Sequence, residues 1–175
     1  MSLVLTFQQN TKNYLVADKF VTKLNTKSAT YEVTRDDCKI KHWKNFALAM
    51  TTPNIAILDF FEHAIEDITL DDTKKGIYDM LIALNKRIVD EFIFIQDQRN
   101  LSYEWLLITQ KNKRYFDSNL AITKVEHKAV GMFSNVADYI LEMNTNDVLG
   151  KIDHIYNYAN NHASRISKEY DIFTL

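Results

Sequence analysis

Glycine and proline are scarce in this chain, which holds three glycines and one proline in 175 residues. Average usage would give about 7% glycine and about 5% proline. Sheet proteins need residues with positive φ in their hairpin turns, and phosphate-binding loops need bare backbone, so both use glycine freely. We therefore predict an all-α protein, built of helices joined by short polar connections. The same scarcity leaves no glycine-rich phosphate loop.

Helix start signals recur along the chain. Thr52-Pro53 is the clearest of them, a hydroxyl N-cap followed by proline at the first helical position, where its missing N–H costs nothing. Thr69-Leu70-Asp71-Asp72 precedes the strongest helical periodicity, over 71–97. Helices are also predicted over about 10–25 and 103–116, and in segments that begin near Thr34, Asp117 and Asn146. These signals predict a single globular helical bundle of six to seven helices over residues 1–175.

Composition excludes several classes of protein. The formal net charge of −2 argues against a nucleic-acid binder, whose affinity would depend on a basic surface. A single cysteine excludes an internal disulfide and suits a reducing cytoplasm. The longest dense apolar stretch, Phe92 to Ile95, is far shorter than the ~20 residues of a membrane-spanning helix. We expect a cytoplasmic protein that neither crosses a membrane nor binds nucleic acid.

One pair of residues has the spacing of a metal half-site. Cys38 and His42 are four residues apart and would share a face of the predicted helix. Thiolate and imidazole are preferred zinc ligands, but a complete site needs two more ligands, and no second pair identifies itself. The alternative is a small buried thiol beside a surface histidine.

His162 is the main candidate for contact with a ligand. It occupies an apolar seam position between Ala159 and Ile166, so we expect its side chain to be buried. A buried imidazole is either a hydrogen-bonded core residue or a ligand-contacting group that is sensitive to pH. Tyr158 and Trp105 complete the predicted ligand-binding set, since aromatic side chains with a polar atom also line pockets.

No catalytic motif identifies itself. Ser102 and Ser118 lie at expected helix caps and outside any Gly-x-Ser-x-Gly sequence, and Glu-x-x-His does not occur. We therefore predict a non-enzymatic regulatory or sensor module without a cofactor, which binds a protein partner or a second copy of itself. The alternative is a sensory bundle that binds a small ligand or a metal. An enzyme whose catalytic residues are dispersed along the sequence stays open.

Overall fold

The computed structural model describes residues 2–25, 27–28, 30–36, 39–66, 73–91, 102–119, 121–143 and 147–175. Within these residues the chain forms eleven strands in three antiparallel sheets, and four helices. The prediction of an all-α bundle is therefore wrong, and the fold is mixed α/β.

The first sheet has the strand order β10-β1-β2-β11 and joins strands from the two ends of the chain. Its members are β1 (Leu3–Gln9), β2 (Lys12–Asp18), β10 (Lys128–Gly131) and β11 (Tyr170–Thr174).

The second sheet has the order β5-β6-β7-β8-β9, and a separate hairpin joins β3 to β4. The strands of the second sheet are β5 (Ile40–Trp43), β6 (Phe46–Thr51), β7 (Glu104–Thr109), β8 (Lys113–Asp117) and β9 (Ile122–Val125). The hairpin consists of β3 (Phe20–Asn25) and β4 (Thr30–Asp36).

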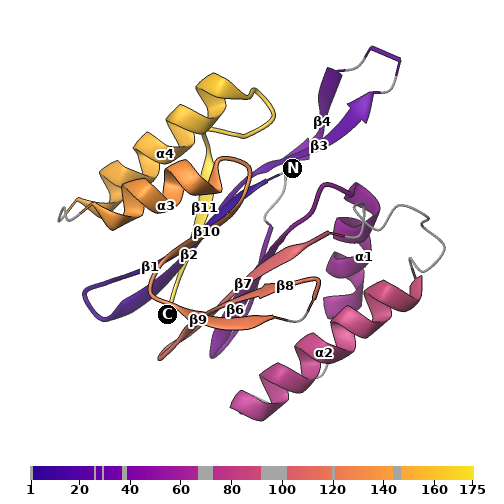
Figure 1. Cartoon of the computed structure of the whole chain (residues 1–175), viewed down its shortest axis with the longest axis vertical. Coiled ribbons are helices and arrows are strands. Elements are labelled where there is room, and N and C mark those ends of the chain that lie inside the picture. Colours follow the sequence, from indigo (N-terminus) through magenta and orange to yellow (C-terminus); the bar gives the residue numbers. More distant parts are fainter. Residues whose placement is uncertain are drawn as a thin grey trace.

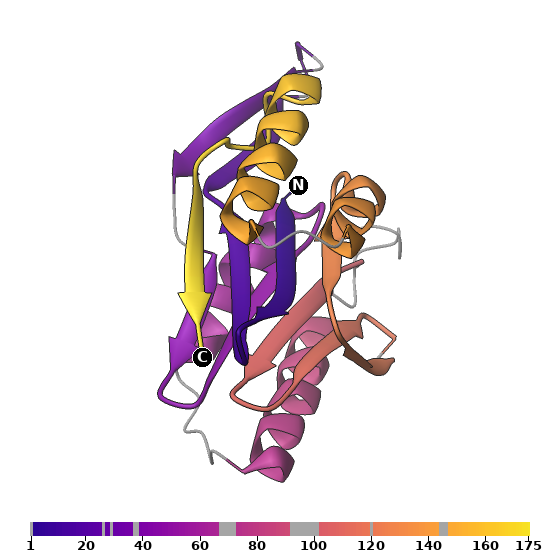
Figure 2. The same ribbon diagram turned by 90° about the vertical axis from the view of Figure 1, so that its left-hand side faces the viewer.

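The two larger sheets lie between two layers of helices (Figures 1 and 2). The helices α1 (Ile55–Glu66) and α2 (Lys74–Glu91) cover the second sheet, and α3 (Ser134–Glu142) and α4 (Val148–His162) cover the first. None of these helices is long and apolar enough to cross a membrane.

The segment 10–25, predicted as a helix, forms β2 and β3, and β2 is buried on both faces like its neighbour β1. Leu3 and Leu5 face the layer of α3 and α4, whereas Val4 between them packs against the second sheet. Both faces of the strand are buried, so apolar and polar residues do not alternate along it. A run that is apolar throughout cannot be assigned to strand or helix by period alone. The segment 103–116, predicted as a helix, likewise forms β7 and most of β8.

The turn between β1 and β2 shows why scarce glycine did not exclude a sheet. Asn10 and Thr11 occupy its two central positions with φ of 48° and 67°. A two-residue hairpin turn requires positive φ at these places, and asparagine tolerates it better than most residues. The turn therefore forms without glycine.

Some local helix signals were confirmed, but those at Thr34 and Asp117 were wrong, since Thr34 lies on β4 and Asp117 ends β8. Helix α2 lies within the predicted segment 71–97, and α1 follows Thr52-Pro53, although it begins at Ile55. The cap of α1 is Asn54, whose Oδ1 accepts the Ala56 N–H at 3.0 Å. The predicted cap at Asn146 lies outside the described residues, and Asp147 caps α4 instead.

Candidate functional site

The first residues of β1 are held from three sides. The Leu3 N–H donates to Asp18 Oδ1 at 2.9 Å, and the Leu3 carbonyl accepts the Tyr156 hydroxyl at 3.0 Å. The Ser2 carbonyl accepts the Met132 N–H at 2.9 Å. These bonds come from β2, from α4 and from the residue after β10, so the backbone of Ser2 is fixed by elements far apart in the sequence.

A buried ion pair lies beside this point. Asp18 is the last residue of β2, and the register pairs Val4 with Ala17, which brings Asp18 opposite Leu3. Its Oδ2 lies 2.9 Å from Lys39 Nζ, and both side chains are fully buried. Lys39 also donates to the Phe20 carbonyl at 2.5 Å. The Asp18 carboxylate therefore links a buried ammonium group to the Leu3 N–H, which belongs to the peptide bond that follows Ser2.

Burial perturbs the titration of this cluster. Loss of solvent raises the pKa of Asp18, although the charge of Lys39 and the Leu3 N–H act in the opposite direction. Burial also raises the pKa of Tyr156 well above its usual value, and the negative charge of Asp18 adds to that effect. Tyr156 therefore stays protonated and donates its hydrogen bond to Leu3 throughout the neutral range.

Gly131 lies against Ser2 at closer range than any other residue type would allow. A Cβ on Gly131 would lie 2.0 Å from the Ser2 carbonyl oxygen. The φ of Gly131 is +88°, a conformation that other residues rarely adopt. One of the three glycines is thus placed where the backbone of β10 passes the start of β1.

Ser2 lines a cavity of about 210 Å³, which we call the Ser2 cavity. Its wall also includes Thr52, Ser102, Glu104, Gly131 and Met132. Ser2 additionally borders a smaller hollow on the side of Val21, Ile55 and Leu58. The smaller hollow measures only about 10 Å³, so of these two spaces only the Ser2 cavity has room for a bound group.

Glu104 is the only charged side chain among the described residues that line the Ser2 cavity. Its Oε1 accepts the Tyr115 hydroxyl at 3.1 Å, and its Oε2 accepts the Gly131 N–H at 3.2 Å. Two donors from different strands fix the carboxylate, which gives the cavity a negative wall.

The predicted ligand-binding residues do not form one site. His162 is exposed on α4, so the expectation that it is buried is wrong. Its Nδ1 lies 2.8 Å from the Tyr158 carbonyl, and its ring stacks on the Tyr158 ring at 4.1 Å. Trp105 is buried on β7, in the core between the second sheet and α1 and α2. His162 and Tyr158 lie on α4, which covers the first sheet. The seam position is exposed because His162 is the last residue of α4, one turn beyond Ala159, where the buried part of the helix ends.

The predicted metal pair cannot be assembled on a helix. His42 lies on β5, where its exposed ring stacks on Phe173 at 4.6 Å, and Cys38 lies outside the described residues. Within the described residues no group of three or more His, Cys, Asp or Glu side chains could hold a metal ion.

Sequence reasoning missed Ser2, Asp18 and Lys39. Their spacing matches no local motif, because the register of β1 with β2 and the contact of Lys39 with Asp18 bring them together. The available signal was small: a serine directly after Met1, ahead of an apolar strand-forming run.

The fold matches solved structures along almost the whole chain. Eukaryotic HslV from Trypanosoma brucei aligns with a TM-score of 0.62 and 12% identity, covering 99% of this chain and 98% of that one. BPH from Thiobacillus denitrificans in complex with epoxomicin gives 0.72 and 13%, covering 99% and 97%. Anbu (ancestral beta-subunit) from Yersinia bercovieri gives 0.69 and 8%, covering 98% and 80%.

Comparison of the sequence alone does not detect this similarity. No family model matches the chain, and no curated protein matches it. The structural likeness nevertheless overturns the predicted function, because a regulatory or sensory helical module does not have this sheet architecture. The chain shares the fold of HslV, BPH and Anbu.

Proposed function

We propose that this protein is an amide hydrolase that uses Ser2 as an N-terminal nucleophile. The observation that carries the proposal is the placement of Ser2 on the wall of a cavity, next to the buried Asp18–Lys39 pair. Cleavage of the Met1–Ser2 bond would leave the hydroxyl and a free α-amine on the same residue. An N-terminal amine can act as the general base for its own side chain, so no histidine is needed.

The first step forms an ester. Ser2 Oγ adds to the carbonyl carbon of an amide bound in the Ser2 cavity, and the proton of Oγ passes to the α-amine. An α-amine has an ordinary pKa of about 8, close to the value that suits a base at neutral pH. The tetrahedral adduct then expels the amine of the substrate, which takes the proton from the α-ammonium as the C–N bond breaks.

The second step releases the acid. Water adds to the ester carbonyl while the α-amine accepts its proton, and the C–O bond to Ser2 breaks as the proton returns to Oγ. Throughout this cycle Lys39 supplies a fixed positive charge that favours the ionised serine oxygen. Asp18 holds Lys39 in place and, through the Leu3 N–H, fixes the strand that carries Ser2.

The fold that the chain shares with HslV, BPH and Anbu supports the proposal. BPH, whose structure holds epoxomicin, covers nearly the same length of chain. The likeness in fold carries no catalytic residue over to this chain, so the assignment of Ser2 depends on its own surroundings.

A peptide α′,β′-epoxyketone tests the proposal. Its ketone can accept the serine hydroxyl and its epoxide the α-amine of the same residue, so the adduct adds the whole mass of the probe without a leaving group. We expect this adduct by intact mass spectrometry on a form of the protein that begins at Ser2. Peptide mapping should place it on Ser2.

Two matched forms serve as controls. A form with one alanine before Ser2 keeps the hydroxyl but loses the free α-amine there, and Ser2→Ala keeps the amine but loses the hydroxyl. Both should fold, by circular dichroism, and neither should form the adduct, whereas Ser2→Thr should still form it. An adduct on Ser2→Ala, or none on a folded form that begins at Ser2, would contradict the proposal.

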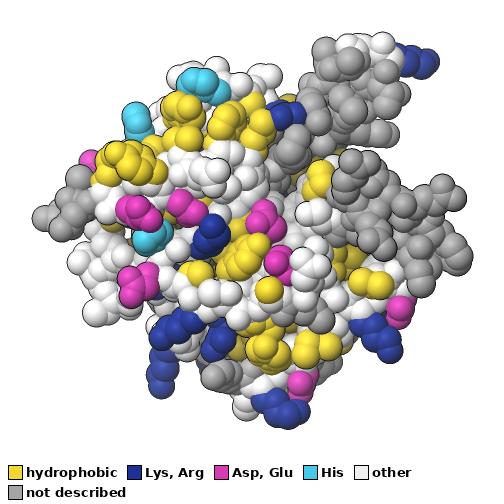
Figure 3. Space-filling model, viewed as in Figure 1, with side chains coloured by type: hydrophobic (Ala, Val, Ile, Leu, Met, Phe, Trp, Pro, Cys, Tyr) yellow, Lys and Arg dark blue, Asp and Glu magenta, His cyan; other side chains and the backbone are white. Residues whose placement is uncertain are grey.

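We also propose that the chain self-associates. One structural neighbour is described as an ancestral beta-subunit. On this chain Tyr139, Met143 and Leu149 of the α3–α4 layer are exposed, at 63%, 44% and 60%. Figure 3 shows hydrophobic and histidine side chains at the surface over these helices. Native mass spectrometry would report the number of copies, and a monomer at micromolar concentration would contradict this proposal.

A further inference from the structure

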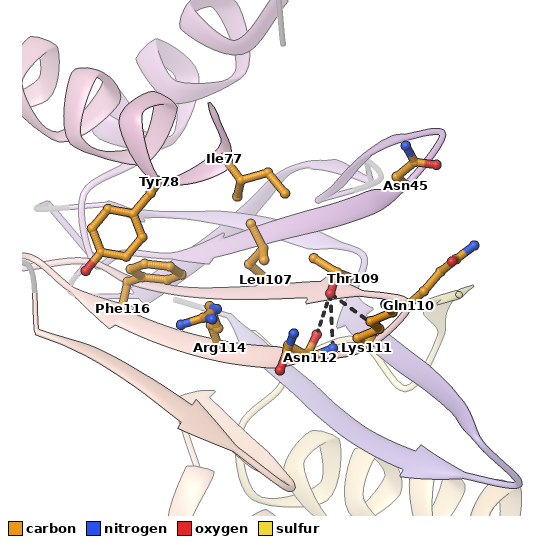
Figure 4. A pocket seen from close by; sticks show the side chains of 10 residues that line it. All are labelled: Asn45, Ile77, Tyr78, Leu107, Thr109, Gln110, Lys111, Asn112, Arg114 and Phe116. Carbon is orange, nitrogen blue, oxygen red and sulfur yellow. Dashed lines mark hydrogen bonds between the residues drawn. The ribbon is translucent and has the colours of Figure 1, made fainter. Parts of the chain in front are cut away.

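A second cavity lies in the other half of the molecule, between α2 and the hairpin that joins β7 to β8 (Figure 4). Its volume is about 490 Å³, within the range of ~300–1,000 Å³ that is usual for small-molecule sites. It shares no lining residue with the Ser2 cavity. We call it the hairpin cavity.

One wall of the hairpin cavity is apolar. Ile77 and Tyr78 project from α2 toward Leu107 on β7 and Phe116 on β8, and the Tyr78 ring lies beside the Phe116 ring (Figure 4). Tyr78 is half-buried, whereas Ile77, Leu107 and Phe116 are buried. A half-buried and a buried aromatic ring that line one apolar slot suit a flat hydrophobic group.

The other wall is positively charged. Arg114 lies opposite Leu107 in the β7–β8 register, so both side chains are on the sheet face that α2 covers. Lys111 joins Arg114 in the lining, which contains no carboxylate among the described residues. Lys124 lies opposite Arg114 on β9 and adds a third cation to this face. Several Lys and Arg side chains come to the surface at this end of the molecule (Figure 3).

These cations are not neutralised within the protein. No ion pair or side-chain hydrogen bond links Arg114 or Lys111 to any residue that the structure describes. Asp79, the acid next to Tyr78 on α2, is held at 2.7 Å by Lys75. A half-buried guanidinium beside an apolar slot therefore offers a planar fork of donors to an anion.

The hairpin itself is preorganised. Thr109 Oγ1 accepts the N–H groups of Lys111 and Asn112 at 3.3 and 3.0 Å, and these bonds appear as dashed lines in Figure 4. On the opposite face of the sheet, Lys113 donates to Asn13 at 3.0 Å, which anchors the hairpin to the first sheet. A site on this hairpin therefore requires little ordering when a ligand binds.

We propose that the hairpin cavity binds a small organic anion in which a carboxylate is joined to a flat apolar group. The carboxylate pairs with Arg114, with Lys111 adding to the positive potential, and the apolar group lies between α2 and the sheet against Tyr78 and Phe116. This site is independent of the proposed hydrolase chemistry at Ser2.

The test uses 4-biphenylcarboxylate and its neutral analogue 4-biphenylmethanol, titrated into the ¹⁵N-labelled full chain. We expect saturable shifts of backbone amide signals in 107–116 and around Tyr78 with the carboxylate. The alcohol should bind at least about tenfold more weakly, because a charge-assisted hydrogen bond contributes about 1.5–3 kcal/mol.

Arg114→Gln should weaken binding of the carboxylate about tenfold or more and leave binding of the alcohol nearly unchanged. Lys168→Gln, which removes an exposed lysine near the first sheet, should change neither. The signal dispersion of each free variant reports its folding in the same spectra. Equal affinity for the two probes, an Arg114→Gln variant that binds the carboxylate like the parent, or no saturation up to millimolar probe would overturn the proposal.

Discussion

Replacing Lys39 by methionine should destabilise the protein strongly, because it leaves Asp18 charged and buried without its partner. Lys39 and Asp18 are both fully buried and 2.9 Å apart. Removing one member of such a pair costs about 3–5 kcal/mol, and methionine keeps most of the apolar stem in place. At about 2–4 °C per kcal/mol for a chain of this length, the melting temperature at pH 7 should fall by roughly 6–20 °C.

The loss should depend on pH with a defined sign. In the variant, burial raises the folded-state pKa of Asp18, and Lys39 no longer opposes that rise. Between the unfolded pKa of about 3.9 and the higher folded value, the folded state binds more protons than the unfolded state. Stability therefore falls as pH rises through this window. The difference from the parent protein should be largest near neutral pH and should shrink as pH is lowered toward about 4.

Urea unfolding measures the effect on four proteins: the parent, Lys39→Met, the double variant Asp18→Asn with Lys39→Met, and Lys75→Met. Asp18→Asn combined with Lys39→Met should recover a large part of the loss, because no charge is then left buried. Lys75→Met is the matched control, since its pair with Asp79 is exposed and should contribute no more than about 0.5 kcal/mol. A Lys39→Met variant within 1 kcal/mol of the parent at pH 7, or a difference that does not change between pH 7 and pH 5, would refute the reasoning.

Three further outcomes are expected. Gly131→Ala should lower the free energy of unfolding by at least about 2 kcal/mol, because its Cβ would lie 2.0 Å from the Ser2 carbonyl and φ is +88°; wild-type stability in urea would contradict the geometry. Tyr156→Phe should cost about 1–2 kcal/mol in the same assay, because the buried Leu3 carbonyl loses its donor. If Ser2 is the nucleophile, the enzyme should prefer peptide amides that contain lysine over those that contain norleucine, measured as the ratio of their kcat/KM values. Glu104→Gln should lower this ratio about tenfold, because it removes the only charged side chain among the described residues that line the Ser2 cavity. An unchanged ratio would show that substrates do not reach Glu104.

Local chemistry explains which parts of the fold could be predicted. Thr52-Pro53 marked the boundary before α1, although the residue that caps this helix is Asn54 and not Thr52. The apolar periodicity of 71–97 contains α2, because that helix is amphipathic and has one buried side. The strands carry no comparable local signal, since the central ones are buried on both faces.

The candidate site depends on tertiary structure almost entirely. Asp18 meets Leu3 because β1 and β2 pair in one register, and a slip of one residue would turn Asp18 to the other face. Lys39 reaches Asp18 from a segment that the sequence suggested was helical, and Glu104 reaches Gly131 across 27 residues.

By itself the sequence determined the helix within 71–97 and the helix boundary that follows Thr52-Pro53, because each depends on neighbours in the chain. Only the tertiary structure decided that two sheets stack between helices, that a buried ammonium lies beside the start of β1, and that Arg114 faces an apolar slot. These features arise from pairing between strands that are distant in sequence, which composition and period do not encode.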